Sequence, residues 1–326
     1  MRSETLHAAA DSIQLQCVGC AATLGHLSLC KSANPTDVHC SNCEFVMRNE
    51  KDIGQAIPSA RLAHFSRFIE DYQTIRAAEG RGSLQEDFYL NLPYQDVTGK
   101  NAWQWKIRAR TFDCLIKKVL PQIIHDRKQS PIVLDLGAGN GWMSYRLALA
   151  GYKPIAVDIL TNDQDGLGAA VHFEKHLDHL FPRFRAEMSR LPFADDQFDA
   201  VIFNASFHYA EDDQAAIREA LRCTKKHGAV IIADSPWYSA AKSGEQMVAE
   251  RQAAFTKQYG TASDSIASVE YLTDKRLAHL EQAFNVRWER DTPFYGLQWT
   301  VRPLLAKLRG RREPSRFRIY SARKTA

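Results

Sequence analysis

Short apolar runs alternate along the chain with segments in which apolar residues recur every three or four positions. Residues 132–136 are apolar on both faces, as the central strand of a parallel sheet must be. A glycine-rich turn follows, residues 142–150 resume helical spacing, and a second apolar run ends at Asp158. This order predicts the strand, turn, helix and strand of half a nucleotide-binding unit.

The same alternation continues on both sides of this unit. Apolar strands are predicted at residues 199–203 and 229–234, with a helix over 215–223 between them. Upstream, the spacing predicts one amphipathic helix over residues 59–80 and a second over about 102–124. The chain is therefore expected to be an α/β protein with helices ahead of its sheet.

Composition and charge narrow the class of protein. At 326 residues, with 45% hydrophobic and 25% charged residues, the chain can bury a full core and has room for one catalytic domain plus accessories. The net charge of +4 is too small to demand a nucleic acid partner. No run of about 18 apolar residues is present, and residues 1–16 do not read as a signal peptide, so we expect a cytoplasmic protein without a membrane span.

Four of the seven cysteines form two C-x-x-C pairs, Cys17 with Cys20 and Cys40 with Cys43. Such pairs place four thiolates at the corners of a tetrahedron, which predicts one structural zinc ion in a ribbon-like head. The alternative is four reduced cysteines in a loop-rich segment. Loss of the metal is expected to unfold this head alone. Reserve ligands are available at Cys30, His26 and His39.

The glycine turn reads G-x-G-x-G, with Gly137, Gly139 and Gly141 allowing the backbone to turn and approach a ligand. Asp135 lies just before the turn, and Asp158 lies where doubly wound folds bind ribose hydroxyls. A carboxylate at Asp135 would repel a pyrophosphate but favour a ligand that carries an ammonium and a sulfonium. S-adenosylmethionine is such a ligand.

The stretch LDLGAGNGWMS with the later AVDI resembles the first two motifs of class I S-adenosylmethionine-dependent methyltransferases, of the methyltransferase type 11 kind. A later stretch is similar to the part of the same family that binds the adenine. In it, Glu187 and Met188 are followed by Leu-Pro-Phe and then by a Phe-Asp pair that begins the fourth strand. The resemblance implies a set of residues that bind the cofactor S-adenosylmethionine: Asp135, Gly137, Gly139, Gly141, Asp158, Ile159, Glu187, Met188 and Asn204.

The resemblance also implies a fold. It is a Rossmann-like sheet of seven strands with the last strand antiparallel, closed by a hairpin of residues 284–289 and 316–321. The expected domains are the zinc-ribbon head (1–57), a helical cap and linker (58–130) and the methyltransferase domain (131–326). Such caps often cover the methyl acceptor, so some aromatic residues are candidates for acceptor walls, with packing as the alternative: Phe88, Tyr89, Tyr94, Trp103 and Trp105.

Methyl transfer from a sulfonium is an in-line displacement, so an enzyme mainly aligns the reactants and excludes water. A base is needed only for an alcohol, a phenol or an acidic carbon. His208, with Tyr209 beside it, lies in the loop after the fourth strand and is the first candidate, although it could equally only donate or accept a hydrogen bond. We expect His172, His176 and His179 to lie on a solvated helix face.

Three functions stay open at this point. The first, which we favour because residues 84–105 are rich in aromatic side chains, is a methyltransferase for a small metabolite. The second is an rRNA or tRNA base methyltransferase that holds RNA with the zinc ribbon and the basic segment 302–318. The third is a cofactor-binding regulator without catalysis. The basic segment is expected to be a solvated helix whose Leu304, Leu305 and Leu308 are buried on one side.

Overall fold

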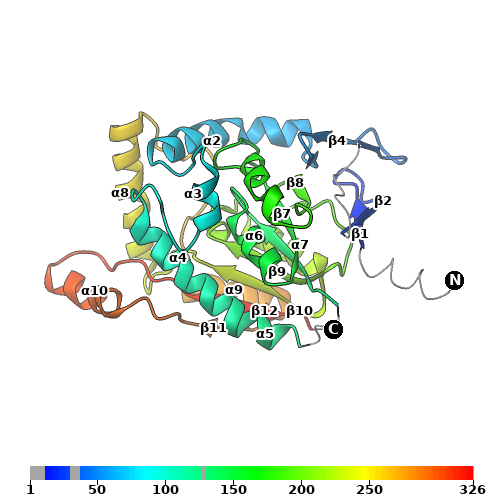
Figure 1. Ribbon diagram of the computed structural model, residues 1–326. Helices are drawn as coiled ribbons and strands as arrows, with labels where there is room; N and C mark the ends of the chain where they lie inside the picture. Colours follow the sequence, from blue (N-terminus) through cyan, green and yellow to red (C-terminus); the bar gives the residue numbers. More distant parts are fainter. Residues whose placement is uncertain (1–11, 30–36, 126–128, 326) are drawn as a thin grey trace.

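One mixed sheet of ten strands forms the centre of the molecule (Figure 1). The structure is a computed structural model that describes residues 12–29, 37–125 and 129–325. The strand order is β11-β12-β10-β9-β6-β7-β8-β5-β4-β3. Their bounds are β3 (Val38–His39), β4 (Val46–Glu50), β5 (Ile53–Gln55), β6 (Ile132–Leu136), β7 (Lys153–Asp158), β8 (Arg183–Arg185), β9 (Phe198–Asn204), β10 (Thr224–Ala233), β11 (Trp288–Asp291) and β12 (Ile319–Arg323).

Seven of these strands, β8-β7-β6-β9-β10-β12-β11, have the arrangement that the sequence predicts. Strands β6 to β10 pair in parallel, and β12 runs antiparallel between β10 and β11. The predicted seven-stranded Rossmann-like arrangement, with its last strand antiparallel, is therefore confirmed.

The other three strands belong to the N-terminal head and enlarge the sheet beyond the prediction. Strand β5 pairs in parallel with β8, and β4 and β3 follow it antiparallel. A separate hairpin of β1 (Ser12–Gln16) and β2 (Thr23–Ser28) completes the head. Ile13 and Leu15 of this hairpin belong to the same core cluster as Phe184 and Phe193. The head and the sheet therefore share one core across residue 57, while the domain boundaries themselves remain predictions.

Helices cover both faces of the sheet. In β6, Leu134 and Leu136 join the apolar layer that contains α7 (Asp213–Cys223) and α9 (Asp274–Phe284), whereas Val133 joins the opposite layer. The opposite layer contains α3 (Glu86–Asn91), α4 (Ala102–Cys114), the π-helical turn η1 (Leu115–Val119), α5 (Leu120–Ile123), α6 (Trp142–Leu149) and the 3₁₀ segment η2 (Leu167–His176). Burial of alternate residues on both faces explains why the central strands are continuously apolar.

The helices predicted upstream are confirmed, as α2 (Ser59–Ala78) and as the run from α4 to α5. Two further helices, α8 (Ala241–Tyr259) and α10 (Leu297–Leu308), lie at the end of the molecule opposite to the head strands (Figure 1). The expected buried side of the basic segment is wrong, because α10 has no buried residue. Its leucines are exposed, with 60% for Leu304 and 75% for Leu308, since no described element packs over them.

None of the helices in the described ranges is both long enough and apolar enough to cross a membrane. The cytoplasmic location stays a prediction.

Candidate functional site

The glycine turn joins β6 to α6 and has a backbone that only glycine adopts readily. Gly137, Gly139 and Gly141 have φ angles of +76°, +55° and +79°. A Cβ at Gly137 would lie 2.2 Å from the Cβ of Ser206, in the loop after β9. The backbone at the turn therefore lies directly against the carboxyl end of the neighbouring strand, where ligands bind in open α/β sheets.

Asp158, at the end of β7, is tied to this turn. Its Oδ2 accepts a hydrogen bond from the Gly139 amide at 2.8 Å, and its Oδ1 accepts one from the Leu160 amide at 2.8 Å. Burial raises the pKa of the Asp158 carboxyl from 3.8 to about 6. The carboxylate is thus held in a fixed position at the end of the second strand, with lone pairs left for a ligand.

Asp135 lies beside it on β6 and is only 1% exposed. The Ser144 hydroxyl donates a hydrogen bond to its Oδ2 at 2.8 Å, while its Oδ1 has no partner among the described residues. Burial raises the pKa of the Asp135 carboxyl from 3.8 to about 7. The negative charge of Asp158 makes a smaller contribution in the same direction. Two partly dehydrated carboxylates therefore favour a cationic ligand at this place.

A cavity of about 370 Å³ opens at the turn, and we call it the turn cavity. All the residues that the sequence assigns to the cofactor line it except Gly141. A Cβ at Gly141 would lie 3.1 Å from the ring of Phe181, so this glycine serves packing behind the turn. Tyr209 also lines the turn cavity. The structure thus brings together side chains from four strand ends.

Helix α2, part of the expected helical cap, covers the turn cavity, whereas the sequence reasoning expected the cap over the methyl acceptor and assigned no residue of α2. Phe65, Phe68 and Tyr72 line it from this helix, and Arg61 donates a hydrogen bond to Glu187 at 2.8 Å. The same guanidinium binds Glu211 at 3.0 Å. The apolar spacing of α2 was visible in the sequence, but periodicity shows which side of a helix is apolar and not what that side faces.

A second cavity of about 400 Å³ adjoins the first, and we call it the arginine cavity. The two cavities share five lining residues: Tyr72, Arg76, Arg108, Ala205 and Tyr209. Trp103 and Trp299 line only the arginine cavity, whereas Trp105 lines the turn cavity. Of the other aromatic candidates for an acceptor wall, Phe88 and Tyr89 are fully buried in the core and Tyr94 is 53% exposed.

His208 lies in the arginine cavity, on the short helical turn η3 (Phe207–Tyr209). Burial, followed by the charges of Arg108 and Arg251, lowers the pKa of His208 from 6.5 to about 3. Its Nδ1 lies 3.2 Å from the Ser235 hydroxyl. The ring is therefore neutral near pH 7 and a weak base.

A carboxylate that the sequence reasoning did not assign lies in the same cavity. Asp234, after β10, accepts a hydrogen bond from the Thr111 hydroxyl at 2.6 Å, and its Oδ2 has no partner among the described residues. Burial raises the pKa of the Asp234 carboxyl. Its position at a strand end was visible in the sequence, but the partner on α4 was not.

The three histidines expected on one solvated face lie differently. His172 stacks on the Tyr89 ring with centroids 4.4 Å apart, and His179 Nε2 lies 3.1 Å from the Leu29 carbonyl oxygen. Only His176 is exposed, and it contacts Glu86 at 3.1 Å. Packing of η2 against α3, and of the segment after η2 against the head, accounts for the difference.

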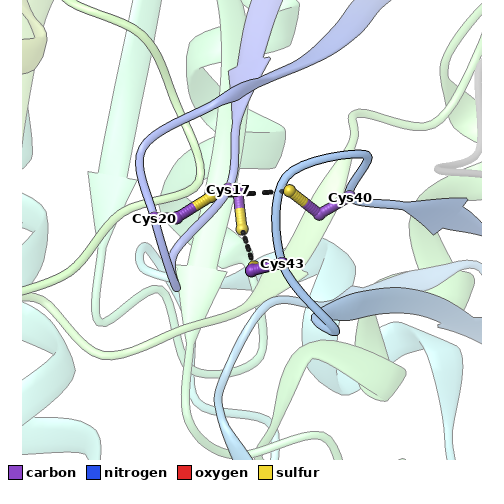
Figure 2. A group of neighbouring side chains, drawn as sticks. All are labelled: Cys17, Cys20, Cys40 and Cys43. Carbon is purple, nitrogen blue, oxygen red and sulfur yellow. Dashed lines mark hydrogen bonds between the residues drawn. The ribbon is translucent and has the colours of Figure 1, made fainter.

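The four predicted zinc ligands converge in the head (Figure 2). Their sulfur atoms all lie within 4.8 Å of one another, with 3.6 Å between Cys17 and Cys43 and 3.5 Å between Cys20 and Cys40. Tetrahedral zinc with Zn–S bonds of about 2.3 Å requires sulfur atoms about 3.8 Å apart, so the set fits this metal. His26 and His39 are not in the cluster. Cys30 lies outside the described residues.

Residues 134–232 match the family described as "Methyltransferase domain". The chain contains a methyltransferase domain of this family. The demethylmenaquinone methyltransferase of Mycobacterium marinum is 34% identical over 31% of this chain and 40% of its own length. The malonyl-[acyl-carrier protein] O-methyltransferase of Halorhodospira halophila is 33% identical over 39% of this chain and 41% of its own. The chain thus spans about two fifths of the length of these relatives.

Among solved structures, the YcgJ protein of Bacillus subtilis is similar with a TM-score of 0.48 and 14% identity, over 65% of this chain and 98% of that one. The part that matches the methyltransferase domain runs from β6 into β10 and holds Asp135, Asp158 and Glu187. Helices α2, α4 and α10, which supply the cover of the turn cavity and much of the arginine cavity, lie outside the match.

Proposed function

We propose that the protein is an S-adenosylmethionine-dependent methyltransferase that methylates an oxygen, nitrogen or carbon atom of a small molecule. The observation that carries this proposal is the pair of adjoining cavities. One has the glycine turn and two buried carboxylates, and the other meets it at Tyr72, Arg108 and Tyr209. A methyl donor and a methyl acceptor need two such compartments with a common boundary.

The residues of the turn cavity fit the proposed donor. Asp158 and Ile159 would hold the ribose, Glu187 and Met188 the adenine, and the unpartnered Oδ1 of Asp135 would face positive charge. The glycine turn and Asn204 would border the methionine end. When bound, S-adenosylmethionine supplies a methyl group already activated on a sulfonium. Helix α2 would exclude water from this compartment.

On the acceptor side, Tyr209 and His208 border the boundary between the cavities. The low pKa of His208, about 3, favours a role as a neutral hydrogen-bonding residue over a role as a base. Where a proton must be removed, Asp234 is the stronger candidate, because burial raises the pKa of its carboxyl and its Oδ2 has no described partner.

We also propose that Cys17, Cys20, Cys40 and Cys43 bind one structural zinc ion. All four positions of a tetrahedral ion would be filled by sulfur, so the ion would have no open coordination site for chemistry. The Gly19 amide donates to the Cys17 sulfur at 3.3 Å and the Asn42 amide to the Cys40 sulfur at 3.4 Å, which stabilises thiolate charge.

A small-molecule acceptor is favoured over RNA. The names of both relatives indicate small or carrier-bound acceptors, demethylmenaquinone in one and a malonyl group on acyl-carrier protein in the other. In the basic segment, Arg312 already pairs with Glu250 at 2.6 Å and Arg316 with Glu313 at 3.2 Å. Because these guanidiniums are already paired with carboxylates, they would bind a phosphate backbone less strongly.

Methyl-label transfer tests the proposal. The purified protein would be incubated with S-adenosylmethionine labelled on the methyl group and a cell extract, which is then separated into small molecules, RNA and protein. We expect label in the small-molecule fraction, and none with the Asp158→Ala variant. Label in RNA would favour the alternative acceptor, and failure of the wild-type protein to bind S-adenosylmethionine in calorimetry would refute the proposal.

A further inference from the structure

Five arginines line the arginine cavity: Arg76, Arg81, Arg108, Arg251 and Arg302. Three of them are neutralised by a carboxylate. Arg76 pairs with Asp165 at 2.5 Å, Arg81 with Glu79 at 2.9 Å, and Arg251 with Glu270 at 2.5 Å. Such pairs hold the walls in place and contribute little net charge to the cavity.

Arg108 and Arg302 differ from the other three, because neither makes an ion pair or a hydrogen bond with a residue that the structure describes. Each guanidinium instead lies over an indole ring, that of Arg108 4.8 Å from the Trp105 centroid and that of Arg302 3.9 Å from the Trp299 centroid. An indole orients a guanidinium but does not neutralise it. Both therefore keep their donors for a ligand.

The surroundings of Arg108 disfavour its positive charge, so an anionic ligand would stabilise it. Burial, and then the charges of Arg76 and Arg81, lowers the pKa of Arg108 to about 10. The negative charge of Asp234 raises the pKa of Arg108 and so opposes this effect. Burial, however, disfavours the ionised form of Asp234 itself. Two unpaired cations against one such carboxylate leave a surplus of positive charge inside the cavity.

Part of the remaining wall is aromatic. Trp103 and Trp299 have ring centroids 6.1 Å apart, and Phe317 stacks on Trp299 at 5.6 Å. All three line the arginine cavity, whose volume of about 400 Å³ suits one small organic molecule. Flat aromatic walls beside two guanidiniums match a ligand with an apolar body and an acid group.

We propose that the methyl acceptor is an acidic small molecule whose carboxylate or phosphate group is bound by Arg108 and Arg302, with an apolar body among the aromatic side chains. This inference rests on the proposed function and specifies its substrate class. Arg108 lines both cavities, so it binds the acid group near the boundary with the donor site, while Arg302 acts from the α10 side.

The test measures binding without requiring the natural acceptor. The wild-type protein is first saturated with S-adenosylhomocysteine, whose binding is measured separately by calorimetry. Benzoate, phenyl phosphate and the uncharged benzyl alcohol are then titrated in, with tryptophan fluorescence and calorimetry as readouts. We expect at least one of the two acids to bind about tenfold or more tightly than benzyl alcohol, because only the acids can form charge-assisted hydrogen bonds with the guanidiniums.

Substitutions locate the interaction. Arg108→Gln and Arg302→Gln should each weaken binding of the acid about tenfold to hundredfold, and Arg108→Lys should keep part of the affinity because it retains charge but loses the planar fork. Arg110→Gln, at an exposed position on the same helix, is the matched control and should bind as the wild type does. Circular dichroism shows whether each variant is folded, and we expect Arg302→Gln to fold because α10 has no buried residue.

Two results overturn the inference. One is equal affinity for benzyl alcohol and the acids, and the other is unchanged acid binding in both glutamine variants. If the wild type binds S-adenosylhomocysteine but does not prefer acids, only the substrate class is wrong. If it does not bind S-adenosylhomocysteine, the proposed function fails as well.

Discussion

Replacing Asp135 by asparagine should stabilise the protein and weaken its binding of the methyl donor. The asparagine has nearly the same shape and can still accept the hydrogen bond from Ser144, which lies 2.8 Å from the carboxylate. It cannot ionise, however, so the free-energy cost of holding a buried charge disappears. The substitution therefore separates the stability of the fold from the function of the site.

The magnitude follows from the pKa of Asp135. In the unfolded chain this carboxyl ionises near 3.8, and in the folded protein it ionises near 7. Between these values the unfolded state releases a proton that the folded state retains, so the folded wild type loses stability as the pH rises, by about 4 kcal/mol in total. The variant should therefore be more stable than the wild type by up to about 4 kcal/mol at pH 8, but by only about 1.5 kcal/mol at pH 5.

Urea denaturation of both proteins at pH 5 and pH 8 measures this difference, with Asp178→Asn, at an exposed position, as the control. Calorimetry at pH 8 should show S-adenosylmethionine binding about tenfold weaker in the Asp135→Asn variant, because an amide does not attract a cation. A stability gain that is the same at both pH values would refute the buried-charge argument. Unchanged donor affinity would refute the assignment of Asp135 to the cationic end of the ligand.

Three further substitutions test other parts of the structure. Gly137→Ala should lose about 2 kcal/mol or more of stability in urea denaturation, and Gly151→Ala only about 1 kcal/mol. Both glycines have positive φ, but only at Gly137 would an added Cβ clash with a neighbour, so equal losses would contradict this account. Cys40→Ser should lose the zinc that elemental analysis detects and should lower the melting temperature of the whole chain, while Cys114→Ser should keep the zinc and the wild-type melting temperature. A lowered transition confined to the head would show that the shared sheet does not couple the head to the rest of the chain. Asp158→Ala should weaken donor binding in calorimetry at least about hundredfold, since it removes the acceptor for the Gly139 and Leu160 amides. Donor binding at wild-type strength would exclude Asp158 from the site.

Much of the geometry of the turn cavity and of the cysteine cluster could be predicted because it depends on local chemistry. Positive φ angles and a close strand end allow only glycine at Gly137, and the spacing of the cysteines follows from the geometry of a four-sulfur metal site. The positive φ angles and the spacing within each C-x-x-C pair act within a few residues and leave a pattern in the sequence. The order of apolar runs likewise predicted four of the parallel strands, and the resemblance to class I methyltransferases implied the seven-stranded Rossmann-like arrangement.

The arginine cavity left no comparable pattern. Arg108 is one of two arginines on α4, and only the fold shows that it lines a cavity without a carboxylate partner among the described residues. Leu304 and Leu308 have the spacing of a buried helix side, yet no described element covers them. The pairing of β5 with β8 was missed for a different reason, because it joins backbone groups of two three-residue strands and needs no particular side chains.

That pairing determines which parts of the sheet can be separated from the rest. Without β5, β4 and β3, the backbone amides and carbonyls of β8 would form an open edge that another chain could pair with. In the intact protein the two outer strands are β3, with two residues, and β11, with four, and strands this short are poor templates for self-association. A chain shortened to the methyltransferase part alone would therefore be prone to aggregate, and the head protects its sheet from other copies of itself.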